Sequence, residues 1–317
     1  MNCSASRERE AYLSSRTLSG PQARGLEFIS QDGGVTLLGA HLVMENSNLC
    51  KVGLGLIWCG RQWPPNNQGW QRPSDEQIDL MLSTGFDLLG DGAKLMLDTA
   101  SGYGESEQRV GSWLTNNATL ASRCVIATKF GETFNCSTGE TTTCHTAAGA
   151  MTVLEASLLT LSRPIDLFYS HITSQLTEAQ AEAVLADDGL RHALVSAKAE
   201  GKVGMLGTSC SYPNVVRTAL RKGWLDELAV VQLPARTCVA EPELIAELRA
   251  AGKLVIANSP VRRVLAAPDE AVTNERVAAA VAELMAACPE VACVLVGTGK
   301  QERLRHIAGC ILSSSSA

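Results

Sequence analysis

Short apolar runs alternate with longer segments of helical pattern eight times along this chain. Each run is apolar on both faces, which is typical of parallel strands that are covered by helices. Eight strand–helix units in one chain of 317 residues predict an α/β fold, a (β/α)8 TIM barrel. The expected strands are residues 52–58, 95–100, 124–130, 166–172, 203–209, 228–234, 254–260 and 292–298.

A helical pattern follows each of these expected strands. Gly85, Gly201 and Gly252 stand at the ends of three of the patterns, where a helix commonly terminates in glycine. The expected helices are residues 75–85, 105–114, 147–161, 178–199, 213–222, 242–252, 275–287 and 301–312.

Both ends of the chain lie outside the eight units. Residues 26–44 hold two short apolar segments around a Gly-Gly pair, which predicts an N-terminal β-hairpin that closes the bottom of the barrel. We expect residues 1–25 to be a disordered N-terminal segment and residues 26–312 to form a single barrel domain. The serine run at residues 313–316 predicts a frayed tail over residues 313–317.

Charge and hydropathy exclude several classes of protein. The formal net charge is −6 and the pI is near 5.5, whereas nucleic-acid proteins neutralise phosphates with a basic face. No apolar run reaches the length of about 18 residues that a membrane-spanning helix needs. Residues 1–25 contain acidic residues and lack the apolar core of a secretory signal. We therefore predict a cytoplasmic protein without nucleic-acid or membrane partners, and leave organellar targeting by residues 1–25 open.

Eleven cysteines are scattered through apolar runs. Their number is odd and no C-x-x-C pair occurs, so we expect neither a disulfide framework nor a structural zinc site. Buried free thiols in a reducing compartment explain this pattern, and no metal is expected.

Chemically active side chains stand at the ends of three successive expected strands. Asp98, Lys129 and His171 end the second, third and fourth strands, and Tyr103 follows Asp98 by five residues. Each alone has an ordinary structural explanation, such as a turn cap or a solvated strand end. In a (β/α)8 barrel, however, the C-terminal ends of the strands form the mouth where active sites lie. Their coincidence therefore predicts a site.

The segments around these residues resemble the aldo-keto reductase superfamily. The most specific is D-T-A-x-x-Y-G-x-S-E at residues 98–107, and A-T-K, D-L-F-Y-S-H, G-K-V-G-M-L-G-T-S, V-V-Q, S-P and V-L-V-G-T follow in barrel order. The resemblance runs from residue 50 to 307, near the sugar-dehydrogenase-like branch. It implies an NAD(P)H-dependent oxidoreductase that interconverts an aldehyde or ketone and its alcohol, or an aldose and its lactone.

The resemblance also implies the role of each catalytic candidate. Tyr103 would be the general acid/base, although a phenol has an ordinary pKa of about 10. The ammonium of Lys129 would stabilise its phenolate, and Asp98 would keep Lys129 charged and oriented. His171 would donate or relay a hydrogen bond to the carbonyl oxygen.

A G-x-G-x-x-G motif after a strand is missing, so a Rossmann domain is not supported. The resemblance implies that NADP(H) lies across the barrel mouth, with NAD(H) left open, and that Ser209 and Gln232 hold its carboxamide. The residues expected to flank the pyrophosphate are Ser259, Pro260, Val261 and Arg263. The residues expected to surround the 2′-phosphate are Gly297, Thr298, Lys300 and Arg303.

Several positions depart from the family pattern. Cys210 stands where Asn commonly follows the serine, and Asn258 stands where many members carry a Tyr that stacks on the nicotinamide. Ile307 takes the place of an adenine-side Asn. These departures bear on cofactor affinity and on the choice between NADPH and NADH more than on the catalytic candidates.

Tryptophans mark the expected substrate side. Trp58, Trp63 and Trp70 lie at the end of the first strand and in the following loop, where aromatic rings can shape a pocket for a small carbonyl compound or a sugar. They could equally hold that loop onto the barrel. The polar residues 131–145, after the third strand, are expected to form a mobile loop.

Two other functions stay open, and the sequence predicts no oligomeric state. A non-catalytic NADP(H)-binding regulatory or scaffold protein of the same fold would bind nucleotide without turnover. A barrel lyase would use Lys129 as a Schiff-base lysine. That chemistry needs a lowered lysine pKa, whereas Asp98 nearby would raise it.

Overall fold

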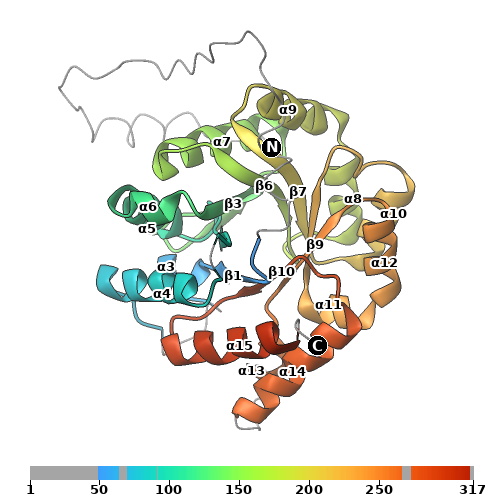
Figure 1. Ribbon diagram of the computed structural model, residues 1–317. Coiled ribbons are helices and arrows are strands. Elements are labelled where there is room, and N and C mark those ends of the chain that lie inside the picture. Colours follow the sequence, from blue (N-terminus) through green and yellow to red (C-terminus); the bar gives the residue numbers. More distant parts are fainter. Residues whose placement is uncertain (1–48, 64–69, 91, 266–272, 315–317) are drawn as a thin grey trace, which may run out of the picture. The chain divides into compact units, whose positions relative to one another are not determined.

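The computed structural model describes residues 49–63, 70–90, 92–265 and 273–314. In them, parallel strands close into a barrel in the order β1-β10-β9-β8-β7-β6-β3-β2 (Figure 1), which confirms the predicted (β/α)8 fold. The N-terminal segment and the hairpin expected before residue 45 lie outside the described residues. The barrel strands are β1 Val52–Gly55, β2 Leu95–Asp98, β3 Cys124–Phe130, β6 Ile165–Ile172, β7 Val203–Cys210, β8 Val230–Pro234, β9 Leu254–Asn258 and β10 Cys293–Val296.

Helices surround the barrel, and short polar residues determine where many of them begin (Figure 1). Ser74 and Thr177 each form a capping box, and Thr146 and Thr273 accept a backbone N–H of the helix that they precede. The helices are α3 Ile57–Gly60, α4 Asp75–Asp87, α5 Ser106–Asn116, α6 Ala118–Ala121, α7 Ala147–Leu161, α8 Glu178–Ala186, α9 Asp188–Ala199, α10 Pro213–Arg221, α11 Ala235–Ala240, α12 Pro242–Ala250, α13 Arg262–Leu265, α14 Asn274–Ala287 and α15 Gln301–Ser314.

The helices differ most from the expected ones in two places. The pattern over residues 178–199 is two helices, α8 and α9, because Asp187 caps α9 by accepting the Leu190 N–H at 2.9 Å. Gly85 does not end a helix but lies inside α4. A Cβ there would lie 2.8 Å from Cδ2 of Leu95, so the glycine allows α4 to pack closely on the barrel.

The segment at residues 131–145, which was expected to be a loop, contains a β-hairpin. Its strands are β4 Glu132–Phe134 and β5 Thr141–Thr143, with Glu132 opposite Thr143. The hydroxyls of Thr133 and Thr142 lie 2.7 Å apart across the pair. Threonine and phenylalanine favour strands, which explains why this polar stretch pairs as a hairpin.

The barrel strands separate two layers of buried side chains, because successive residues of a strand point to opposite faces. One face fills the barrel interior and the other packs beneath the helices. Tyr169 fills part of the interior beside Gly207, where a Cβ would lie 2.7 Å from Cδ1 of Tyr169. The interior residues are Met96, Val125, Ala127, Leu167, Tyr169, Met205, Val230, Ile256, Cys293 and Leu295.

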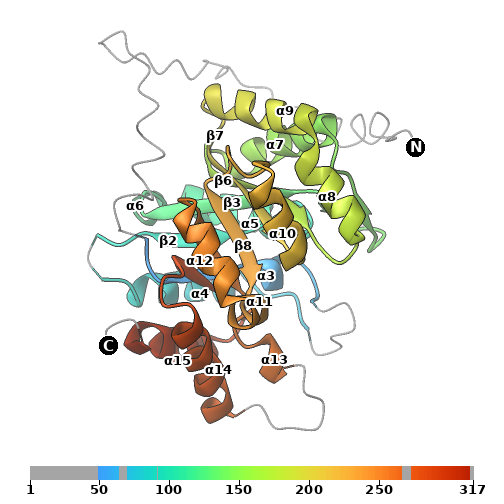
Figure 2. The same cartoon turned by 90° about the vertical axis from the view of Figure 1, so that its right-hand side faces the viewer.

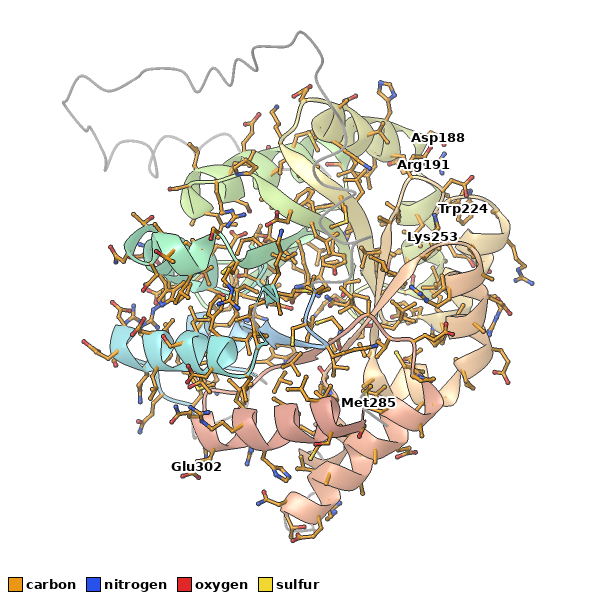
Figure 3. The ribbon with its side chains drawn as sticks, viewed as in Figure 1. Asp188, Arg191, Trp224, Lys253, Met285 and Glu302 are labelled. Atoms are coloured by element: carbon orange, nitrogen blue, oxygen red, sulfur yellow. The ribbon has the colours of Figure 1, made fainter. Side chains whose placement is uncertain are left out.

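The last two helices, α14 and α15, pack against each other on the outside of the barrel (Figure 2). Because α15 continues through Ser314, the first two residues of the expected tail are helical, and residues 315–317 lie outside the described part. On the outer surface, Arg191 of α9 pairs with Asp188 three residues earlier (Figure 3).

The described residues contain ten cysteines and no group of three His, Cys, Asp or Glu side chains that could hold a metal ion. None of their helices is long and apolar enough to cross a membrane.

Candidate active site

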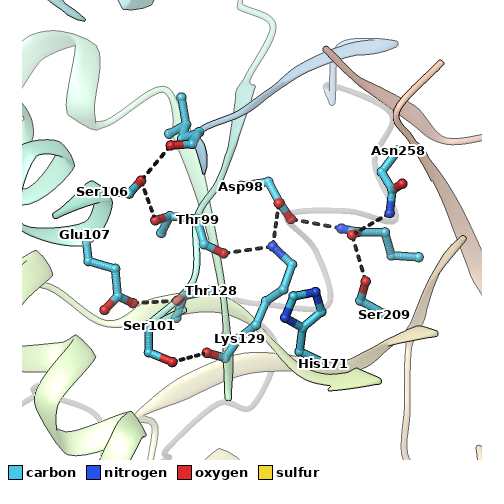
Figure 4. A network of polar contacts seen from close by, with 12 residues as sticks. Asp98, Thr99, Ser101, Ser106, Glu107, Thr128, Lys129, His171, Ser209 and Asn258 are labelled. Carbon is cyan, nitrogen blue, oxygen red and sulfur yellow. Dashed lines mark hydrogen bonds and ion pairs between the residues drawn. The ribbon is translucent and has the colours of Figure 1, made fainter. Parts of the chain in front are cut away.

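The period of two along the strands turns three of the predicted catalytic side chains inward. Asp98, Lys129 and His171 each stand two residues after a side chain that faces the barrel interior. They stand at the C-terminal ends of β2, β3 and β6, which are neighbours in the barrel. The structure therefore brings them together at the C-terminal mouth (Figure 4).

Asp98 and Lys129 form a fully buried ion pair. Nζ of Lys129 donates to Oδ1 of Asp98 at 2.5 Å and to the Thr99 carbonyl oxygen at 2.8 Å. Their side chains are 3% and 0% exposed. Burial lowers the pKa of Lys129, but the charge of Asp98 and the neighbouring Tyr103 raise it by more, so the net shift is upward. Lys129 is therefore an ammonium, which disfavours Schiff-base chemistry.

The loop that carries Tyr103 is held by close backbone contact with α3. A Cβ at Gly104 would lie 2.5 Å from the Gly60 carbonyl oxygen, and one at Gly60 would overlap the Tyr103 carbonyl oxygen. Gly104 also has φ +63°, a region that glycine enters without strain. This packing places the Tyr103 ring with its centroid 4.7 Å from Nζ of Lys129.

Small polar residues of the same motif connect this loop to its neighbours. The Ser101 hydroxyl lies 3.0 Å from the Lys129 carbonyl oxygen and 2.7 Å from that of Glu132. Thr99 donates to the Ser106 hydroxyl at 2.8 Å, which in turn donates to the backbone after β1. The small residues between Asp98 and Glu107 thus hold the loop in place.

Glu107 anchors α5 to the barrel. Its Oε1 accepts the hydroxyls of Thr128 on β3 at 2.5 Å and Ser157 on α7 at 2.7 Å. Burial raises the pKa of Glu107, although both hydrogen bonds oppose the rise. The side chain supports the site without facing the mouth.

Glu107→Gln is expected to change how stability depends on pH. A raised folded pKa means that the native state keeps a proton which the unfolded state has lost, so the free energy of unfolding falls as pH rises from about 4 through the folded pKa. Glutamine does not titrate and should lack this fall. Urea unfolding between pH 4 and 7 measures it; parallel curves for the two proteins would contradict the expectation.

The pKa of Tyr103 shifts in the direction opposite to the expected one. Burial raises it, the Lys129 ammonium lowers it and Asp98 raises it again, so the net shift is upward. Burial destabilises the phenolate of Tyr103 by more than the nearby Lys129 ammonium stabilises it. In the free protein Tyr103 is therefore protonated, which is the form that a proton donor needs.

His171 faces Tyr103 edge-on, with ring centroids 6.1 Å apart and planes at 81°. Burial lowers the pKa of His171 far below its ordinary value, and the charges of Lys129 and Arg61 lower it further. The imidazole is therefore neutral at pH 7.

Glu132, which no sequence motif indicated, joins the site from β4. Its Oε2 lies 3.6 Å from Nδ1 of His171, and its Oε1 accepts the Thr173 hydroxyl at 2.5 Å. His145, at the end of the hairpin, places Nε2 2.9 Å from the His171 carbonyl oxygen. The threonine-rich sequence of the segment is the signal that could have predicted the hairpin and, with it, the position of Glu132.

The residues expected at the nicotinamide are linked to the ion pair. Ser209 and Gln232 stand opposite each other on β7 and β8, and the serine hydroxyl donates to Oε1 of Gln232 at 2.9 Å. Asn258 donates to the same oxygen at 3.1 Å. Nε2 of Gln232 donates to Oδ2 of Asp98 at 2.9 Å (Figure 4). A chain of hydrogen bonds thus connects the ends of β9, β8, β7 and β2.

The residues expected at the pyrophosphate follow β9. Ser259 is exposed and has φ +55°, which is strained for a residue other than glycine. Pro260 and Val261 are buried behind it, and Arg263 lies in α13. The exposed, strained serine therefore marks the mouth at this strand end.

The residues expected at the 2′-phosphate follow β10. Gly297 is exposed, and a Cβ there would lie 3.6 Å from the Gly55 carbonyl oxygen. Thr298 is buried and its hydroxyl accepts the Lys300 N–H at 3.2 Å. Lys300 is exposed just before α15, and Arg303 is half-buried in its first turn. Two cations thus flank a helix N-terminus, where an anion is favoured.

Comparison with known proteins identifies the family. The model of the Aldo/keto reductase family matches residues 51–278, well over half of the chain. The chain belongs to the aldo/keto reductase family. Membership implies NAD(P)H-dependent oxidoreductase activity on small carbonyl compounds. The match ends before β10, so the residues expected at the 2′-phosphate lie beyond it.

Solved structures agree with this assignment at the level of the fold. A Pseudomonas aeruginosa protein assigned to the aldo-keto reductases is 24% identical, with a TM-score of 0.65; the alignment covers 83% of this chain and 90% of that one. An aldo-keto reductase from Bacillus halodurans in its holo form is 19% identical, with a TM-score of 0.62 and coverage of 84% and 90%. A search of curated proteins found no match.

Two departures from the aldo/keto reductase pattern lie in the core. Cys210 is buried beneath the helices, because it follows the inward Ser209 by one residue. Burial raises the pKa of the Cys210 thiol to about 12, so the thiol is inert, and it points away from the barrel interior. Ile307 is buried on the inner face of α15.

The three tryptophans lie in two places in this aldo/keto reductase. A Cβ at Gly299 would lie 3.0 Å from Cε3 of Trp58, so the Trp58 ring borders the loop after β10. Trp70 donates its indole N–H to the Trp58 carbonyl oxygen at 3.0 Å. Trp63 instead lies against the Arg61 guanidinium, whose Cζ is 5.2 Å from the centroid of the Trp63 ring. The same Cζ is 4.5 Å from the ring centroid of Phe134 on β4. Trp58 is therefore on the expected cofactor side and Trp63 is near the hairpin.

Proposed function

We propose that this protein uses NADP(H) to interconvert an aldehyde or ketone and its alcohol, or an aldose and its lactone, with Tyr103 as the general acid/base. One observation carries the proposal. The buried Lys129–Asp98 pair, 2.5 Å apart, lies against the Tyr103 ring at the barrel mouth. A buried ammonium beside a phenol is the arrangement that proton transfer by tyrosine requires.

Side chains of this protein can supply the proton that the substrate oxygen gains on reduction. In the direction of reduction, protonated Tyr103 gives its proton to the substrate oxygen. The Lys129 ammonium stabilises the phenolate that remains, and Asp98 keeps Lys129 charged and in place. In the direction of oxidation the same phenolate takes the proton back. When bound, the nicotinamide supplies or accepts the hydride.

The residues at the mouth fit NADP(H). The polar pair Ser209 and Gln232 suits the carboxamide, since a hydroxyl and an amide can both donate and accept. Lys300 and Arg303 suit the 2′-phosphate, because two cations beside a helix N-terminus favour an anion. Lys300 and Arg303 are the reason for proposing NADPH instead of NADH.

A nucleotide titration tests this assignment. Trp58 borders the loop after β10, so NADPH should quench the protein's fluorescence saturably. The double variant K300A/R303A should bind NADPH about tenfold more weakly, the loss expected for charge-assisted phosphate contacts, and NADH almost as before. Equal losses for both nucleotides would mean that these cations do not contact the 2′-phosphate.

Turnover then separates the two functions that fit this fold. Adding aldehydes, ketones and aldoses to the NADPH complex should consume NADPH, as seen in its absorbance. Binding without turnover across that panel would instead support a regulatory or scaffold protein. No binding of either nucleotide would overturn the cofactor assignment.

A further inference from the structure

The loop after β1 contains a buried arginine whose charge has no counter-ion. Arg61 follows α3 directly and is 8% exposed. Among the described residues its guanidinium donates one hydrogen bond, from Nη1 to the Thr141 hydroxyl at 3.1 Å, and no carboxylate accepts from it. Nε is buried and has no partner in that part of the chain. The described residues therefore leave both the charge and an N–H of Arg61 unpaired.

Aromatic rings hold this guanidinium in place without neutralising it. Cζ of Arg61 lies between the rings of Trp63, at 5.2 Å from the centroid, and Phe134, at 4.5 Å. Burial nevertheless lowers the pKa of Arg61, although the charge of Glu132 opposes this shift. Removing a cation from water is costly unless an anion or hydrogen bonds replace the lost hydration. An anion that reaches Arg61 therefore gains a cation that is already desolvated and held in one position.

Arg61 lies beside the proposed proton donor. A Cβ at Gly104, the residue after Tyr103, would be 3.1 Å from Cβ of Arg61. Thr141, which accepts the guanidinium N–H, belongs to the hairpin that follows β3. The side chain thus joins the loop after β1 to the loop after β3, and the strand between them, β2, carries the Tyr103 loop. All three loops follow C-terminal strand ends, so the guanidinium lies at the mouth, and its charge lowers the pKa of His171 there.

The other charges around Tyr103 favour a carboxylate over a phosphate as the anion. Lys129 is already neutralised by Asp98, so it offers no second cation. The negative charge of Glu132 also acts on Arg61, and it would repel the two charges of a phosphate more than the single charge of a carboxylate. A planar guanidinium matches a carboxylate, which it binds through two parallel N–H bonds.

We propose that Arg61 is a specificity-determining residue that pairs with a carboxylate of the substrate, while Tyr103 acts on the carbonyl oxygen of the same molecule. The substrate is then an oxo acid, a carbonyl compound that also carries a carboxylate. This substrate class rests on the proposed function, because it places the carbonyl at Tyr103. A neutral aldehyde leaves the Arg61 charge unpaired and is therefore the poorer substrate.

Binding of a carboxylate can be measured without turnover. In the full-length protein labelled with ¹⁵N, Arg61→Lys identifies the Nε–H signal of Arg61, because lysine lacks this group. Benzoate is the probe, and benzamide is its neutral counterpart of the same shape. At constant ionic strength benzoate should shift the Arg61 signal saturably, since a carboxylate accepts from the guanidinium, and benzamide should leave it in place. An Arg61 signal that does not respond to benzoate, or responds equally to benzamide, would overturn the proposal.

Selectivity tests the substrate class. The ratio of kcat/KM for 4-oxobutanoate to that for its methyl ester should favour the acid in wild type and fall about tenfold or more in Arg61→Met, the size of one charge-assisted hydrogen bond. The ratio cancels any effect that the lost charge has on the catalytic step itself. Added salt should weaken the preference for the acid, because it screens the ion pair. A wild type that prefers the ester, or a ratio unchanged in Arg61→Met, would contradict the assignment.

Arg123→Met is the matched control. Cζ of Arg123 also lies over an aromatic ring, 5.6 Å from the centroid of Phe86, but this residue precedes β3 and so stands at the opposite end of the barrel. The variant should keep both the ratio and the response of the Arg61 signal to benzoate. An equal fall in the ratio would show a general loss of packing, and the proposal would fall. If wild type reduces neither the acid nor the ester, the proposed function fails, while the benzoate titration still decides whether Arg61 binds a carboxylate.

Discussion

Tyr103→Phe is expected to lower kcat by about 10³-fold, the usual contribution of a positioned general acid. The variant loses only the phenol hydroxyl, and its ring can still lie beside Nζ of Lys129. NADPH affinity should therefore change little. Steady-state kinetics and fluorescence titration on the same preparation measure the two quantities.

Tyr212→Phe is the matched control, because it removes a hydroxyl that donates to the Leu176 carbonyl oxygen outside the catalytic group. It should cost about 1 kcal/mol of stability, the value of one hydrogen bond, and keep kcat. If Tyr103→Phe kept kcat as well, another group would be the proton donor. If both variants lost kcat equally, the loss would report a general effect of removing buried hydroxyls.

Lys129→Met is expected to lower the free energy of unfolding by about 3–5 kcal/mol, because it leaves the Asp98 carboxylate buried without its partner. The expected loss is large since both side chains are almost fully buried and solvent cannot screen the charge that remains. Chemical denaturation measures it. Activity should fall with it, because the phenolate of Tyr103 loses its stabilising charge.

The double variant D98N/K129M separates the structural cost from the chemical one. Neither side chain is charged, so most of the lost stability should return, while kcat stays low. The amide oxygen that replaces the carboxylate of Asp98 can still accept the N–H that Gln232 donates to Asp98 in the wild type. A double variant no more stable than Lys129→Met would show that something other than the unpaired charge causes the loss.

Much of the fold follows from local patterns. Strands that are apolar on both faces, each followed by a helix, leave few architectures other than a barrel. The position of Asp98, Lys129 and His171 follows equally, since the ends of parallel strands meet at one mouth. The role of Tyr103 was predicted only from the resemblance to the family. In the structure, the close backbone contact between Gly60 and Gly104 explains its position.

Strand parity could have corrected one expectation. Residues two apart share a face, so Ser209 faces inward and Cys210 must point outward into the core. The departure at Cys210 therefore says little about the nicotinamide site. Asn258 has the inward parity, and its contact with Gln232 brings it into the polar chain.

The other differences depend on contacts that a sequence pattern does not contain. Gly85 was expected to end a helix, but close packing against β2 explains it. The direction of the Tyr103 pKa shift depends on burial, which outweighs the nearby ammonium. Glu132 reaches His171 only because three-residue strands form a hairpin in a polar loop. Residues 1–25 and the cytoplasmic location stay predictions.

We propose that this chain transfers a hydride between a nicotinamide and a carbonyl carbon with Tyr103 as the proton donor. The most direct test is a single-turnover reaction with NADPH that carries deuterium at both positions of nicotinamide C4, followed by mass spectrometry of the alcohol. We predict an alcohol with one deuterium on the former carbonyl carbon from wild type, and none formed on that time scale by Tyr103→Phe. An alcohol without deuterium, or no alcohol from protein that is saturated with NADPH, would show that the protein does not transfer this hydride.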